Sequence, residues 1–137
     1  AADLEHFKAS SEQLVKQYSA YRPFPDLALD GKLTLGENIA DVAGLAVAYD
    51  AYRLSLGGKE AAAIQDVTGD QQFFISFAQS WRSKYREPAL RQRVVTDGHS
   101  PGEYRAKTVR NLDAWYAAFN VKDGTLYLAP ADRVRIW

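Results

Sequence analysis

Two carboxylates, Glu37 and Asp41, lie four residues apart in the stretch 34–45, which opens the most apolar run of the sequence. In a helix, residues at this spacing share one face, so both acids would point the same way. Buried helices seldom carry acids unless the acids are paired or bind a metal. A metal site, with Glu37 as a ligand and Asp41 as a helper that orients a neighbouring ligand, is therefore one interpretation of this pair.

A simpler interpretation of Glu37 is structural. Thr34-x-x-Glu37 before an apolar run is typical of a capping box, in which each side chain accepts a backbone hydrogen bond at the start of a helix. A glutamate at this end also complements the helix dipole. On physical grounds alone the capping box is favoured. Asp41, one turn deeper among apolar residues, is harder to explain in this way.

The elements that would position these acids are helical. The longest predicted helix spans residues 35–56, where Gly44 and several alanines would allow neighbouring helices to approach closely, and Gly57 and Gly58 would end it. Weaker patterns predict a helical turn at 59–65, a loop at 95–101 and a short extended segment at 126–128, and leave 102–109 unassigned. The other predicted helices are 3–21 with Asp3 as N-cap, 71–85, 88–94, and 111–120 with Asn111 as cap.

Composition limits the class of protein. With 137 residues, 25% of them charged and 47% hydrophobic, the chain has the size and make-up of one globular domain. The net charge is zero and no basic run is present, so nothing favours nucleic-acid binding. Without cysteine, disulfides and thiolate metal sites are excluded. We therefore expect one mainly α unit over residues 1–137.

Four blocks along the chain resemble, in the same order, the neprilysin family of zinc endopeptidases. Residues 36–41, Gly-Glu-Asn-Ile-Ala-Asp, are similar to a family signature, and residues 73–81 to its aromatic segment. Residues 91–105 resemble its His-Ser-Pro block, and residues 133–137 its terminal block, which ends in tryptophan. The resemblance implies a mainly α fold, the helical C-terminal portion of a thermolysin-like (zincin) catalytic domain.

The resemblance also implies roles for individual residues. Glu37 corresponds to the family's third zinc ligand. Asp41 corresponds to the acid that accepts a hydrogen bond from a zinc-bound histidine and fixes its tautomer. These two assignments agree with the interpretation from helical spacing.

Further roles follow for the later blocks, each with a plainer alternative. His99 matches a histidine that donates to the oxyanion of the tetrahedral intermediate, and Asp97 the carboxylate that orients it; otherwise His99 is a loop residue bonded to backbone. Arg105 matches an arginine that binds a substrate carbonyl, but it could equally form a surface ion pair with Glu103. Trp81 resembles part of the apolar pocket beside the scissile bond, and it could also be a core aromatic.

The family's His-Glu-x-x-His motif, which supplies two zinc ligands and the general base, does not occur, because the only histidines are His6 and His99. We therefore expect a C-terminal fragment of the catalytic domain that is inactive alone. Its partner would be the N-terminal portion that carries the motif, its substrate a peptide and its cofactor Zn²⁺. Gln13 and Val134 stand where animal relatives have cysteines, which points to a bacterial-type member. The resemblance also implies a location outside the cytoplasm (periplasmic, secreted or cell-surface), as in the relatives.

Two functions are therefore considered. The first is that of a zinc endopeptidase part that supplies the third zinc ligand together with oxyanion-binding and substrate-binding residues. The second is that of a helical module, derived from a peptidase and no longer catalytic, that binds other proteins. The presence or absence of His-Glu-x-x-His before Ala1 in the parent protein distinguishes them.

Overall fold

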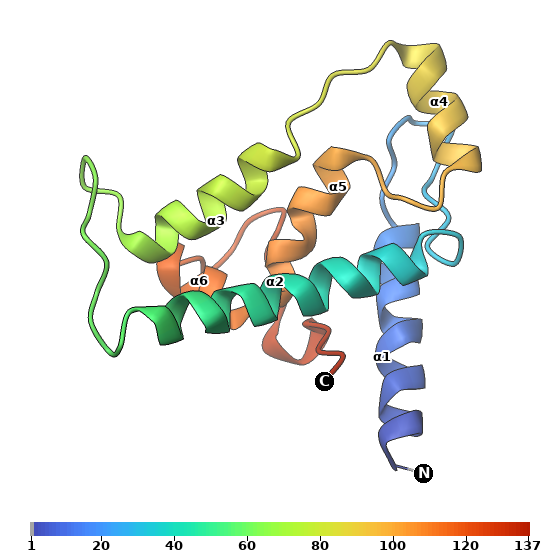
Figure 1. Ribbon diagram of the computed structural model, residues 1–137. Helices are drawn as coiled ribbons and strands as arrows, with labels where there is room; N and C mark the ends of the chain where they lie inside the picture. Colours follow the sequence, from blue (N-terminus) through green and yellow to red (C-terminus); the bar gives the residue numbers. More distant parts are fainter. Residues whose placement is uncertain (1) are drawn as a thin grey trace.

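The computed structural model describes residues 2–137, and this part of the chain is helical, as predicted (Figure 1). Extended pairing within it is limited to isolated bridges between Phe24 and Leu27 and between Ile64 and Val67. The α-helices are α1 (Ala2–Ser19), α2 (Leu35–Ser55), α3 (Gly69–Ser80), α4 (Glu87–Thr96), α5 (Gly102–Ala106) and α6 (Asp113–Phe119), and the 3₁₀ helices are η1 (Lys107–Asn111) and η2 (Pro130–Asp132).

The central helix α2 contributes to two core clusters. Near its beginning α1 crosses it (Figure 1), and Val42 packs with Leu14 and Tyr18 of α1. One turn further on, Leu45 packs with Phe74 of α3 in a second cluster. Because side chains on one face of α2 enter both clusters, the helix is held along much of its length. Its opposite face remains open to solvent at Val47, which is 65% exposed.

The helix boundaries follow the predictions closely at α1 and α2. Asp3 lies within the first turn of α1 rather than at an N-cap, and there it complements the helix dipole. At the other end of α2, Gly57 and Gly58 have φ values of 58° and 80°, the left-handed backbone that glycine adopts without steric cost. Across residues 2–137, no helix is both long and apolar enough to cross a membrane.

Several local predictions are wrong. Residues 59–65 form no helical turn, and residues 126–128 are not a strand. Asn111 does not cap α6, which begins two residues later. Instead its buried amide oxygen accepts hydrogen bonds from the side chain of Gln17 and the backbone amide of Val134, at 3.0 Å each. Asn111 therefore joins α1 to the C-terminal segment, a long-range role that helix patterns do not reveal.

The close packing predicted at Gly44 is not found there. Gly44 does not mediate close helix packing, because it is exposed and a methyl group there would meet no atom within 4 Å. Close approach occurs at Gly31 instead. It is buried against the end of α1, and a Cβ there would overlap the carbonyl oxygen of Val15 and crowd the hydroxyl of Ser19.

These surroundings predict opposite effects for one substitution. Gly31→Ala should lower the free energy of unfolding by about 1–3 kcal/mol, because the methyl would meet backbone that cannot move aside. Gly44→Ala should raise it by up to about 1 kcal/mol, because alanine is the better residue in an exposed helix. Urea unfolding of the two variants beside the parent chain measures both. Equal effects of the two substitutions would contradict this account of the packing.

Candidate functional site

All of the residues singled out for chemistry lie in one connected cluster at the beginning of α2. Glu37 and Asp41 come from α2, and Arg105 comes from α5. The others lie on the segments around them: Asp97 and His99 on the loop between α4 and α5, and Trp81 at the end of α3. These segments are far apart in the sequence, so folding alone brings the group together.

Glu37 lies in the first turn of α2, but it forms no capping box. Thr34 occupies the N-cap position without a side-chain cap bond. The Thr34 hydroxyl instead donates to the carbonyl oxygen of Asp30 at 3.1 Å. The Glu37 carboxylate, 42% exposed, lies 3.3 Å from Nε2 of His99 and 3.7 Å from a guanidinium nitrogen of Arg105. The capping box predicted for Glu37 is therefore wrong. The glutamate still lies in the first turn, where it complements the helix dipole, and its carboxylate belongs to the cluster.

Asp41 and Arg105 form a bidentate ion pair in a largely buried position. Nε of Arg105 donates to one carboxylate oxygen at 2.8 Å, and a terminal nitrogen donates to the other at 2.6 Å. The Asp41 side chain is 7% exposed. The hydrogen bond to Asp41 is the main cause that raises the pKa of Arg105, so the guanidinium stays charged. Glu103, the alternative partner predicted for Arg105, pairs with Lys107 instead.

Trp81 contacts the same arginine. The guanidinium carbon of Arg105 lies 3.9 Å from the centre of the Trp81 ring, a cation–π arrangement. The ring also packs edge-on against Phe77, with 6.2 Å between centroids. Trp81 thus contacts both the apolar face of α3 and the charged group, which agrees with a pocket wall and with a core aromatic at the same time.

His99 is oriented by Asp97, two residues earlier. One carboxylate oxygen of Asp97 lies 2.8 Å from the backbone nitrogen of His99 and 2.8 Å from its ring Nδ1. The backbone amide of His99 is the first cause, and its ring the second, that lowers the pKa of Asp97. Because Nδ1 faces Asp97, Nε2 points to the other side, toward Glu37. The histidine is therefore more than a free loop residue.

The cluster offers one carboxylate that suits a zinc ion. A carboxylate such as that of Glu37 is a suitable zinc ligand, and its partial exposure leaves it accessible. Within residues 2–137, however, no three or more His, Cys, Asp or Glu side chains are grouped so that they could hold a metal. A protein zinc site needs at least three ligands. Among residues 2–137, Glu37 is thus a candidate ligand that has no further zinc ligands grouped with it.

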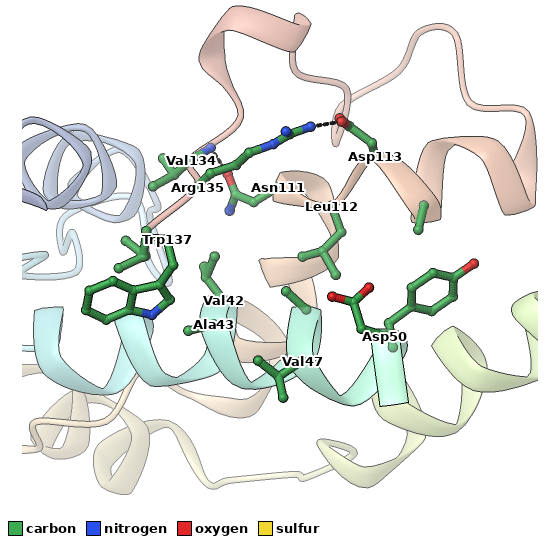
Figure 2. A pocket seen from close by; sticks show the side chains of 14 residues that line it. Val42, Ala43, Val47, Asp50, Asn111, Leu112, Asp113, Val134, Arg135 and Trp137 are labelled. Carbon is green, nitrogen blue, oxygen red and sulfur yellow. Dashed lines mark hydrogen bonds and ion pairs between the residues drawn. The ribbon is translucent and has the colours of Figure 1, made fainter. Parts of the chain in front are cut away.

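A separate groove of about 420 Å³ lies along α2 (Figure 2). Its walls come from α2, from residues 111–114 and from the C-terminal residues 134–137, and Trp137 and Val47 stand at its edge. None of the predicted site residues lines it. The groove and the charged cluster are thus different features of the surface.

Sequence reasoning missed two buried polar residues beside the cluster. Asn38 follows Glu37 and is 0% exposed, and Ser100 follows His99 and is 1% exposed. The Ser100 hydroxyl donates to the Asn38 side-chain oxygen at 2.8 Å. Their only signal in the sequence is position, since each stands next to a predicted site residue inside a block that resembles the neprilysin family.

Comparisons with known proteins agree with the resemblance. The sequence profile of peptidase family M13 matches residues 1–135. Human membrane metallo-endopeptidase-like 1 is 40% identical over 97% of this chain, and human neprilysin is 36% identical over 96% of it. The zinc metalloprotease Zmp1 of Mycobacterium tuberculosis, solved with an inhibitor, superposes with a TM-score of 0.93 at 44% identity over 97% of this chain.

The match covers nearly all of this chain but a small part of each relative. The chain spans 18% of the length of both human proteins and 22% of the Zmp1 chain. Profile, identity and fold nevertheless point to the same relatives. The chain therefore belongs to peptidase family M13, the family that includes neprilysin.

Proposed function

We propose that this chain is the C-terminal part of a zinc endopeptidase catalytic domain that hydrolyses peptide bonds in oligopeptides. The observation that carries the proposal is the connected cluster of Glu37, Asp41, His99 and Arg105, in which each side chain contacts another. A protein-binding surface would not require acids and bases assembled from separate segments at hydrogen-bonding distance. Membership of peptidase family M13 supports the same reaction class.

In this proposal Glu37 supplies one zinc ligand, and Asp41 orients a histidine ligand from another segment while it holds Arg105. The ion itself would polarise the scissile carbonyl and lower the pKa of its bound water toward about 7. His99, with Asp97 on Nδ1, presents Nε2 as a donor to the oxyanion. The Asp97 carboxylate on Nδ1 orients the His99 ring, as carboxylates that fix a histidine tautomer do, and Nε2 is the ring nitrogen proposed as the donor.

Arg105 and Trp81 would bind the substrate. The Arg105 guanidinium is fixed by Asp41 on one side and by the Trp81 ring on another. A fixed guanidinium loses little rotamer entropy when it donates to a peptide carbonyl. The side chain of Arg105 is 16% exposed, so part of it remains accessible.

The two histidine ligands and the general base would come from an N-terminal portion of the same peptidase, and we propose an extracytoplasmic location for the whole. The relatives' length supports such a portion, since this chain spans about a fifth of it. Large apolar side chains exposed to solvent also support the presence of an N-terminal portion that would cover them. Leu4, Val47, Leu54 and Trp137 are 56%, 65%, 81% and 83% exposed.

A non-catalytic interaction module is the second candidate. The open apolar groove along α2 favours it, because a groove of this kind can accept a partner segment (Figure 2). The coding sequence before Ala1 separates the two candidates directly. His-Glu-x-x-His in the parent protein supports the peptidase, and a parent without that motif would leave the interaction module.

The proposal predicts that the isolated chain is inactive. We expect no chelator-sensitive cleavage of a fluorogenic oligopeptide by residues 1–137, and no retention of zinc through gel filtration, because one carboxylate cannot hold the ion. The measurements are a peptidase assay and metal analysis of the purified chain. Robust turnover that a chelator abolishes, with no second segment present, would contradict the proposed division of ligands.

Glu37→Gln tests the zinc ligand in the complete peptidase. The amide is a much poorer ligand than the carboxylate, so we expect zinc content and turnover to fall together, with turnover at least about 100-fold lower. Metal analysis and kcat measure the two effects. Glu12→Gln, on the exposed side of α1, is the matched control and should change neither. Full zinc content and full turnover in the Glu37 variant would disprove the role.

Arg105→Lys tests substrate binding through the guanidinium. Lysine keeps the charge but cannot donate to Asp41 and to a carbonyl in the same fixed geometry. A charge-assisted hydrogen bond contributes about 1.5–3 kcal/mol, so kcat/KM should fall about 10- to 150-fold with zinc content unchanged. Arg22→Lys, an exposed arginine outside the cluster, is the control. An unchanged kcat/KM for Arg105→Lys would rule out this role.

A further inference from the structure

A chain of buried hydrogen bonds runs beneath the charged cluster. The Thr34 hydroxyl donates to the carbonyl oxygen of Asp30 at 3.1 Å, and it accepts from the side-chain nitrogen of Asn38 at 2.9 Å. The side-chain oxygen of Asn38 accepts from the Ser100 hydroxyl at 2.8 Å. Thr34, Asn38 and Ser100 are 2%, 0% and 1% exposed. This series of hydrogen bonds, shielded from water, therefore joins the turn before α2, α2 itself and the loop before α5.

The direction of the hydrogen bonds in this series, from donor to acceptor, is determined by the first bond. The Thr34 hydroxyl has a single proton, which it gives to the Asp30 carbonyl, so it can only accept from Asn38. The amide nitrogen of Asn38 must then face Thr34, and its oxygen must face Ser100. Each of the three bonds along the path thus has one donor and one acceptor, and only this amide orientation is compatible with all of them.

Asn38 and Ser100 connect this series of hydrogen bonds to the site, because each is adjacent in the sequence to a site residue. Asn38 immediately follows Glu37, and Ser100 immediately follows His99. Successive helical residues point about 100° apart, so Asn38 enters the interior where Glu37 faces outward. Ser100 also stands two residues before α5, the helix that carries Arg105. One buried bond therefore connects the backbone that bears Glu37 to the backbone that bears His99 and Arg105.

The exposed side chains of the site cannot maintain this geometry themselves. Glu37 and His99 are 42% and 46% exposed at their side chains, and their contact is 3.3 Å long. Ion pairs as exposed as this contribute little free energy. A buried hydrogen bond costs more to break, because the group left behind has no water to replace its partner. Two buried links therefore join these backbones: the Asp41–Arg105 pair holds α5 to α2, and the Asn38–Ser100 bond holds the loop next to His99 to α2.

We propose that Asn38 and Ser100 are positioning residues, which set the distance between the metal-ligand carboxylate of Glu37 and the oxyanion donor Nε2 of His99. Neither touches the substrate. The proposal rests on the proposed peptidase function for its catalytic consequence, but its geometric part concerns residues 2–137 alone and can be measured in the chain as it stands.

The geometric test is NMR of the 137-residue chain. In the parent chain, proton–proton NOEs should connect the His99 ring with the Glu37 side chain. Ser100→Ala should weaken these NOEs at least about threefold, since the loop loses its buried bond to α2 next to His99, whereas Ser100→Thr, which keeps the hydroxyl, should retain them. Ser10→Ala is the matched control, because it deletes another buried serine hydroxyl, bonded to the carbonyl oxygen of Arg135 at 2.8 Å and away from the site.

The catalytic test uses the complete, zinc-loaded peptidase. Ser100→Ala should lower kcat about tenfold or more while KM changes less than about twofold, because misplacing a reacting group by a fraction of an ångström costs rate rather than binding. Ser100→Thr should recover most of the loss. Asn38→Ala combined with Ser100→Ala should cost no more than the larger single effect, since both remove the same bond.

The outcomes are distinguishable. Ser10→Ala should lower Tm as Ser100→Ala does, yet leave NOEs and kcat unchanged. If Ser100→Ala changes only Tm, the residue is merely structural and the proposal is overturned. If the complete parent peptidase shows no turnover, the proposed function fails, while the NOE comparison still decides whether Asn38 and Ser100 set the geometry.

Discussion

The buried ion pair between Asp41 and Arg105 is the constraint on which the site depends. The two residues are 64 positions apart, and they join the second turn of α2 to the short helix α5. A charged carboxylate that is 7% exposed is costly without a partner, and removal of one member of such a pair costs about 3–5 kcal/mol. Any arrangement of α5 that leaves Asp41 unpaired is therefore strongly disfavoured, and Arg105 is placed as a consequence.

Around this pair acidic and basic side chains alternate. Arg105 lies between Asp41 and Glu37, and His99 lies between Glu37 and Asp97. Such an order lets each acid have a base as neighbour and each base have two acids, which limits repulsion among carboxylates on one helix face. Arg93 continues the order, 3.0 Å from Asp97. The cluster is held in place by the buried Asp41–Arg105 pair and by the bond between Asn38 and Ser100 beneath it.

Much of the fold was predictable, since helical periodicity is a local property. The long apolar run, the glycines that end it and the proline in the first turn of α4 all act within a few residues. Predictions failed where a long-range contact decided the outcome. Thr34 satisfies the carbonyl of Asp30 and the amide of Asn38 rather than capping α2, and Asn111 binds α1 and the C-terminal segment rather than capping α6.

The sequence by itself determined that the chain is helical, which family it resembles, and which acids and bases are candidates for chemistry. These follow from residue types and spacing along the chain. Only the tertiary structure decided which candidates meet, because contacts between α2, α5 and the loop 97–101 depend on packing across the whole domain. It also revealed Asn38 and Ser100, since the burial of a polar side chain is a property of its surroundings and not of its place in the chain.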